Sequence, residues 1–248
     1  MATTAPASAK AKKRKAQDDG GARKKRKSKY EEDESLLDLK AGVNTVFTFM
    51  DSQLLSDYVT KKTTKFGTDL SPVELSDLYI SANAVKDTTS WQKLRTLSNL
   101  PDFLESFVKD PKELGEAPTK KGAPHTIIVT GAGIRAADIV RKYQKKGNSV
   151  AKLFAKHIKL DEAVDFLNRS RTGLGVGTPA RLMDLLDNGA LSVEHLKRIV
   201  VDASHIDQKK RGVMDMKDTM MPLAKWLARK EFKDRYTDEQ KPLDLLFY

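Results

Sequence analysis

Apolar residues in the second half of the chain follow two spacings. Short, nearly continuous apolar runs have the form of strands covered on both faces, and they occupy residues 125–129, 150–154, 174–176, 199–201 and 242–248. Between them, apolar side chains recur three and four positions apart, as on one face of a helix, within residues 136–143, 160–167, 182–186 and 219–230. Strands that alternate with helices of this length predict an α/β fold, with a parallel sheet and helices on both faces.

The first half carries weaker signals. A helix is expected after Pro101, followed by a linker over residues 109–124. Residues 35–100 predict an extended arm with helices of one or two turns, interrupted by a polar stretch at residues 60–68. Ser71 and Glu74 have the spacing of a capping box, and Trp91 is expected to anchor the arm on the domain. A flexible spacer is the alternative for this segment.

Residues 172–205 contain the most informative pattern, which reads as strand, loop, helix and strand. Thr178 stands where a helix N-cap belongs, and Pro179 follows at the first helical position. Asn188 and Gly189 end that helix. The next strand delivers Asp202 at its carboxyl end, where open α/β sheets place their ligands.

The net charge of +11 is concentrated at the amino terminus of this 248-residue chain. Residues 1–29 hold eleven lysines and arginines against two aspartates, whereas the remainder is nearly balanced. Two clusters have the form of nuclear-localisation signals: Lys12, Lys13, Arg14, Lys15 and Arg23, Lys24, Lys25, Arg26, Lys27. A nucleic-acid-binding arm and a solvated tail without a reader are the alternatives. We therefore expect a disordered tail at 1–34, an arm and linker at 35–124 and an α/β domain at 125–248.

Composition excludes several functional classes. The chain has no cysteine, which excludes disulfides and cysteine-based sites. The first residues lack the apolar region of a secretory signal, and no apolar run approaches the roughly 18 residues of a membrane span. The four histidines show no metal-ligand spacing. We expect no metal, no cofactor and no membrane partner.

Residues 176–182 resemble the VGTPGRL motif of DEAD-box RNA helicases, and the spacing to Asp202 matches the distance from that motif to the DEAD box. The resemblance implies an incomplete RecA-like first domain. In that family the threonine and arginine of this motif contact the RNA backbone, which makes Thr178 and Arg181 candidate RNA-binding residues. Their structural alternative is a helix cap and a surface arginine.

Other positions depart from the helicase pattern. The box reads Asp202, Ala203, Ser204, His205, so the glutamate is lost. Ala180 replaces a glycine, Ala155 and Lys156 replace a double glycine, and the arginine of motif Ia is not matched in place. The chain also contains no Gly-Lys-Ser or Gly-Lys-Thr that could cradle phosphates. We therefore expect no ATPase activity.

A rival interpretation rests on Gly131 and Gly133, which follow a strand and precede a helix as in a dinucleotide-binding loop. That loop would make the chain a dinucleotide-binding oxidoreductase. The acidic residue expected at the end of the next strand is missing from residues 152–156.

Taken along its length, the chain resembles the Cms-type nucleolar proteins of the small-subunit pre-ribosome. The shared features are the basic tail, the LSDLYI-like residues 75–80, the glycine-rich residues 173–182 and the degenerate box at 202–205. The resemblance implies a non-enzymatic assembly factor in the nucleus and nucleolus. Its partners would be pre-rRNA, the snoRNA-containing particle and other assembly proteins. A chromatin or mRNA-binding protein is a further, minor alternative.

Overall fold

The computed structural model describes residues 1–2, 34–144 and 149–248. The two basic clusters and most of the predicted tail lie outside the described residues. Contacts divide the chain into Met1–Asp33 and Glu34–Tyr248, and the second unit contains all of the regular structure described below.

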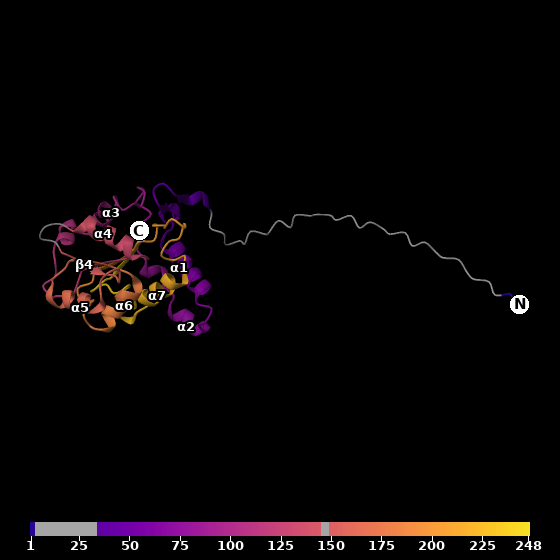
Figure 1. Ribbon diagram of the computed structural model, residues 1–248. Coiled ribbons are helices and arrows are strands. Elements are labelled where there is room, and N and C mark those ends of the chain that lie inside the picture. Colours follow the sequence, from indigo (N-terminus) through magenta and orange to yellow (C-terminus); the bar gives the residue numbers. More distant parts are fainter. Residues whose placement is uncertain (3–33, 145–148) are drawn as a thin grey trace. The chain divides into compact units, whose positions relative to one another are not determined.

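A five-stranded parallel sheet forms the centre of Glu34–Tyr248 and confirms the predicted fold class (Figure 1). Its strands, in spatial order, are β4 (Val150–Leu153), β5 (Leu174–Gly177), β3 (Thr126–Val129), β6 (Arg198–Val201) and β7 (Asp244–Phe247). All four strand pairings are parallel. The neighbouring strands β3 and β6 pair Val129 with Val201, so these two strands end side by side. This register brings the residues that follow the two strands together at the carboxyl end of the sheet, which is referred to as the sheet edge.

Helices cover both faces of the sheet, because successive strand residues point to opposite sides. Ile127, Ile199 and Leu245 belong to one apolar core, whereas Ile128 and Val200 belong to the other. The first core lies under α5 (Leu160–Arg169), α6 (Pro179–Asp187), α7 (Lys217–Leu227) and α8 (Lys230–Lys233). The second lies under α3 (Leu100–Ser106) and α4 (Gly133–Tyr143), on the other side of the sheet in Figure 1. The sheet therefore sits between two helical layers, as in an incomplete RecA-like fold.

The first helix of the arm is much longer than the sequence predicted. α1 runs over Ser52–Phe66 and includes most of the polar stretch that was expected to be extended. Leu55, Val59 and Thr63 recur along one face and are buried against the domain. The hydroxyl of Thr63 donates to the Val59 carbonyl at 2.8 Å, so the threonine satisfies its own polar group inside the helix. Tertiary packing overrides the weak local helix preference here.

The rest of the arm and the linker contain short elements. They are η1 (Glu34–Leu36), β1 (Leu37–Asp38), β2 (Val43–Asn44), η2 (Thr45–Thr48), α2 (Pro72–Asp77), η3 (Ala82–Ala84) and η4 (Pro111–Gly115). The capping box at Ser71 and Glu74 is confirmed at the start of α2.

Two arm segments lie against the sheet and the loop that follows β6. Val43 forms an antiparallel bridge with His205, and Val85 forms a parallel bridge with Leu245 on the free side of β7. Trp91 is buried edge-to-face on Phe103, with ring centroids 5.7 Å apart, and shares an apolar core with Ile128 and Val200 of the sheet, which confirms it as an anchor on the domain. The arm thus contributes to both apolar cores. That residues 125–248 fold independently of the arm stays a prediction, which unfolding measurements can test.

Among the helices of the described residues, none has the length and apolar character required to cross a membrane.

Candidate functional site

Asp202 lies at the carboxyl end of β6, as predicted, but its carboxylate is already occupied. Arg135, in the first turn of α4, donates from Nε to Oδ2 at 2.8 Å and from Nη2 to Oδ1 at 3.0 Å. Thr130, directly after β3, donates its hydroxyl to Oδ2 at 3.1 Å. The Asp202 side chain is fully buried and that of Arg135 is 9% exposed. The neighbouring ends of β3 and β6 bring these three residues together.

This pair fixes the electrostatics of the site. Burial alone would lower the pKa of Arg135, but the adjacent Asp202 carboxylate outweighs it and raises the pKa. The guanidinium therefore stays charged and neutralises Asp202. Both carboxylate oxygens already accept hydrogen bonds from the protein, and a cation bound here would lie beside the Arg135 guanidinium and be repelled by it. Within the described ranges, no group of three or more metal-ligating side chains is close enough to hold an ion.

Residues 203–205, which follow Asp202, are enclosed by the arm and by the end of β7. The Asn44 N–H donates to the Ser204 carbonyl at 2.7 Å, and the Ser204 N–H donates to the Tyr248 carbonyl at 2.7 Å. Ala203 and Ser204 are buried. Burial also lowers the pKa of His205. The β6–β7 half of the sheet edge is therefore closed by the chain itself.

The glycine loop does not fit a dinucleotide. Such a ligand needs open space where its pyrophosphate approaches the glycine backbone. A Cβ placed at Gly131 would lie 3.0 Å from the Cα of Val213, and one placed at Gly133 would lie 2.9 Å from the Cβ of Lys156. Protein atoms fill the space beside both glycines, which argues against the oxidoreductase interpretation.

Thr178 and Arg181 lie together at the β4–β5 half of the same edge. Thr178 occupies the N-cap position of α6, as predicted, but its hydroxyl makes no capping hydrogen bond. Its N–H instead donates to the Leu153 carbonyl at 3.2 Å. Arg181 is half-buried and donates from Nη1 to the Ile158 carbonyl at 3.1 Å.

The loop held by Arg181 carries two exposed cations. Lys156 and Lys159 lie exposed between β4 and α5, as does His157. His157 adopts a positive φ of 59°, which is uncommon for a residue other than glycine. Lys156 crosses over Gly133 at the start of α4. Together with Arg181, these side chains make this half of the edge basic and accessible, in contrast to the closed β6–β7 half.

Sequence reasoning missed two features of this edge. Arg135 and Asp202 are 67 positions apart, and no sequence pattern singled out Arg135. The adjacency of β3 and β6 was the only signal that could have paired them. Lys156 had been noted only as the loss of a glycine, although its side chain places a new cation at the edge.

A model of a known protein family matches residues 3–248, and its description is "CMS1: U3-containing 90S pre-ribosomal complex subunit". The chain is 63% identical over 220 residues to Protein CMS1 of Chaetomium thermophilum, covering 88% of each chain. It is 29% identical over 192 residues to Protein cms1 of Schizosaccharomyces pombe, covering 76% of this chain and 66% of the relative. Protein CMSS1 of Homo sapiens is 34% identical over 125 residues, covering 48% of this chain and 45% of the relative. These matches confirm the Cms-type resemblance, and the chain belongs to the family of U3-containing 90S pre-ribosomal complex subunits.

Proposed function

We propose that this chain is a non-enzymatic assembly factor of the early small-subunit pre-ribosome, the small-subunit processome, and that it works in the nucleus and nucleolus. The observation that carries the non-enzymatic part is the buried pair between Arg135 and Asp202. A helicase-type carboxylate must be free to hold a metal-bound water beside a phosphate cradle. Here an internal guanidinium takes the place of that cation.

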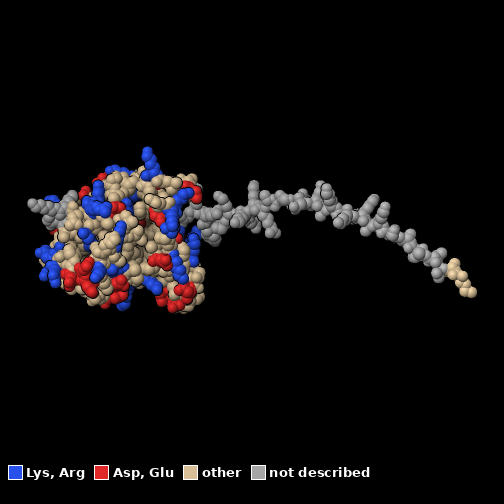
Figure 2. Space-filling view, viewed as in Figure 1, with Lys and Arg blue, Asp and Glu red and all other residues tan. Residues whose placement is uncertain are grey.

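We further propose that the basic β4–β5 half of the edge contacts pre-rRNA or a snoRNA through phosphate groups. Arg181 contributes its remaining N–H groups, and the exposed Lys156 and Lys159 add positive charge. Thr178 leaves its hydroxyl free of the helix and available to a phosphate oxygen. Charged side chains of both signs are interspersed on the face seen in Figure 2, so the contact would be local rather than spread over a uniformly basic surface.

The proposal separates this contact from general attraction to RNA. The basic clusters within residues 12–27 would supply affinity that is independent of sequence and strongly dependent on salt. The folded edge would then fix the position of the chain in the particle, because phosphate contacts from a rigid site set orientation. Neighbouring assembly proteins would bind other surfaces.

Charge reversal at Arg181 tests this role. We expect Arg181→Glu to reduce both RNA crosslinking at the β4–β5 edge and incorporation into 90S-sized particles, because the variant repels phosphate and loses the bond to Ile158. Arg181→Lys keeps the charge and should recover much of both signals. Arg169→Glu is the matched control, because Arg169 ends α5 and is 79% exposed.

Normal folding of Arg181→Glu together with wild-type crosslinking and incorporation would overturn the RNA contact. Recruitment would then depend on the tail and arm.

A further inference from the structure

Ser35, near the start of the arm, stands in a strongly acidic sequence. Four acidic residues precede it directly, at 31–34, and Asp38 is the third residue after it. Acidophilic protein kinases bind such sequences through basic grooves, because opposite charges attract across the interface. Ser35 is exposed in the short helix η1. Its hydroxyl is therefore a candidate acceptor of a phosphoryl group.

Four other hydroxyl residues also have an acidic residue at the third position after them, but each is less suitable. Thr48 and Ser204 are buried. Ser71 and Glu74 bind each other in the capping box of α2, with N–H to oxygen distances of 3.3 and 2.8 Å. Ser28 has a lysine on each side, which a basic groove would repel. Ser35 has none of these disadvantages.

A basic turn, formed by residues 207–211, lies beside the start of the arm. The Asp207 carboxylate holds the turn by accepting from the Lys209 N–H at 2.8 Å. Lys209 and Lys210 are exposed on it. Lys210 pairs at 3.1 Å with Glu34, which directly precedes the serine, whereas Lys209 has no ion pair with any residue that the structure describes. A phosphate on the serine would therefore find two cations at one fixed turn.

We propose that Ser35 is phosphorylated by an acidophilic serine/threonine protein kinase, and that Lys209 and Lys210 bind the phosphate. In the reaction a bond forms between Ser35 Oγ and the γ-phosphorus of ATP. The bond from that phosphorus to the bridging oxygen breaks, ADP leaves and the hydroxyl proton is released.

The new phosphate would carry a charge of about −1.5 to −2 at neutral pH, so it would compete with Glu34 for Lys210. It would fasten the start of the arm to the loop that follows β6, on the closed half of the sheet edge. This modification site goes beyond the proposed RNA contact and does not depend on it.

Phosphorylation of the full chain by casein kinase 2, with magnesium and ATP, tests the site, because that enzyme prefers an acidic residue at the third position after the serine. Mass spectrometry locates the phosphate and radioactive ATP gives the rate. We expect Ser35 to carry most of the phosphate and Ser35→Ala to lose it. Asp38→Asn should be phosphorylated at least tenfold more slowly. Asparagine keeps the oxygen that accepts from the Ala41 N–H at 2.9 Å, so the β1–β2 turn is retained.

Asp57→Asn is the matched control, because Asp57 is an exposed acid of the arm outside this acidic sequence. Its rate should stay within twofold of wild type. The same phosphopeptide is expected in protein isolated from nuclei of its own species. Absence of phosphate from Ser35 in either preparation, or a rate unchanged by Asp38→Asn, would overturn the site.

Phosphorus NMR of the phosphorylated chain tests whether the turn binds the phosphate. Nearby lysines favour the doubly charged phosphate and lower the pKa of phosphoserine. Replacing Lys209 and Lys210 together by alanine should therefore raise that pKa, whereas Lys225→Ala, at an exposed position on α7, should leave it unchanged. An equal pKa in phosphorylated wild type and in the double variant would overturn the binding of the phosphate by the turn.

Discussion

The ion pair of Arg135 and Asp202 is buried where two central strands end, and its two partners depend on each other. Arg135→Ala leaves a carboxylate buried without its cation, and we expect a loss of about 3–5 kcal/mol in the free energy of unfolding. Replacing both partners by apolar residues, as in Arg135→Met with Asp202→Leu, should recover most of that loss. Urea unfolding of the two variants measures both values. A single substitution that costs less than about 1 kcal/mol would show that the pair is not buried as described.

His125 carries a different charge-dependent interaction, at the amino end of β3. Its Nε2 donates to the Glu116 carbonyl at 3.0 Å, so Nδ1 is left to accept from the Thr126 hydroxyl at 2.7 Å. Arg198 Nη1 donates to that same hydroxyl at 3.2 Å. Burial, with a smaller contribution from Arg198, lowers the pKa of His125 to about 4, and the folded protein holds the imidazole neutral.

This histidine predicts a pH dependence of stability. The unfolded chain takes up the proton near pH 6.5 and the folded chain only near pH 4. Stability from this group is therefore full above pH 6.5 and is lost progressively as the pH falls to 4, by roughly 3 kcal/mol. Between pH 6.5 and pH 4, the free energy of unfolding of His125→Gln should decline less steeply than that of wild type. The variant His157→Gln, at an exposed position, is the control and should follow wild type. If the curves of unfolding free energy against pH run parallel for His125→Gln and wild type, the folded protein does not hold the His125 imidazole neutral.

At the scale of elements, α1 tests whether the arm is part of the folded unit. Leu55 is fully buried and its neighbour Leu54 is 51% exposed, so the two make a matched pair. We expect Leu55→Ala to lower the free energy of unfolding by about 2–5 kcal/mol, and Leu54→Ala by less than about 0.5 kcal/mol. Both variants should unfold in one transition when followed by tryptophan fluorescence and circular dichroism. Two separate transitions would mean that residues 125–248 fold without the arm.

The strands and helices of the second half could be predicted because their apolar spacing is strong and local. α1 could not, because Lys62 and Thr63 are buried only through contacts made far along the chain, including an ion pair between Lys62 and Asp215. The N-cap position of Thr178 was predicted correctly, but local spacing could not show that its hydroxyl makes no capping hydrogen bond. Long-range pairs such as Arg135 with Asp202 leave no spacing signal within a single sequence.

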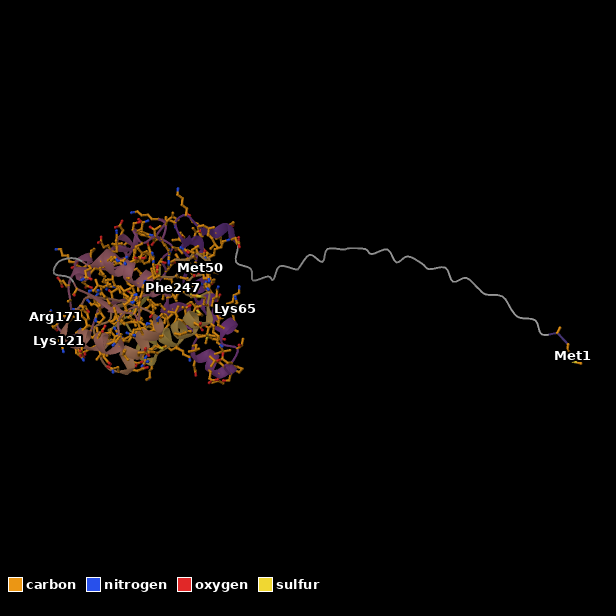
Figure 3. All side chains as sticks on the ribbon, viewed as in Figure 1. Met1, Met50, Lys65, Lys121, Arg171 and Phe247 are labelled. Carbon is orange, nitrogen blue, oxygen red and sulfur yellow. The ribbon has the colours of Figure 1, made fainter. Side chains whose placement is uncertain are left out.

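Arginines with several donors also connect distant elements. Arg171, before β5, donates to the carbonyls of Ala117 and Pro118 in the linker. Arg171 and Lys121 lie at one end of the unit in Figure 3, away from Lys65 on α1. Arg95, from the arm, is fully buried and donates to the Thr88 carbonyl and, through Nη1, to the Phe247 carbonyl. Burial lowers its pKa to about 10, so it stays charged at neutral pH. Such contacts tie the linker and the arm to the sheet.

At the scale of the whole molecule, charge is divided between two parts. The basic clusters hold most of the net charge of +11, whereas the rest of the chain is nearly neutral. Deletion of both clusters should disperse the protein from the nucleus and reduce the salt dependence of RNA binding, by nearly one unit of slope for each lost phosphate contact. Fluorescence microscopy and binding titrations at several salt concentrations check these two effects. Unchanged nuclear concentration together with an unchanged slope would leave the clusters without this role.

The central claim is that the chain serves the 90S pre-ribosomal complex without nucleotide chemistry, because Arg135 and the arm close the β6–β7 half of the sheet edge. Isothermal titration calorimetry of the full chain with magnesium and ATP tests it most directly. The account predicts no binding with a dissociation constant below about 1 mM, which corresponds to roughly −4 kcal/mol. Saturable ATP binding tighter than this, lost in Asp202→Asn, would contradict it.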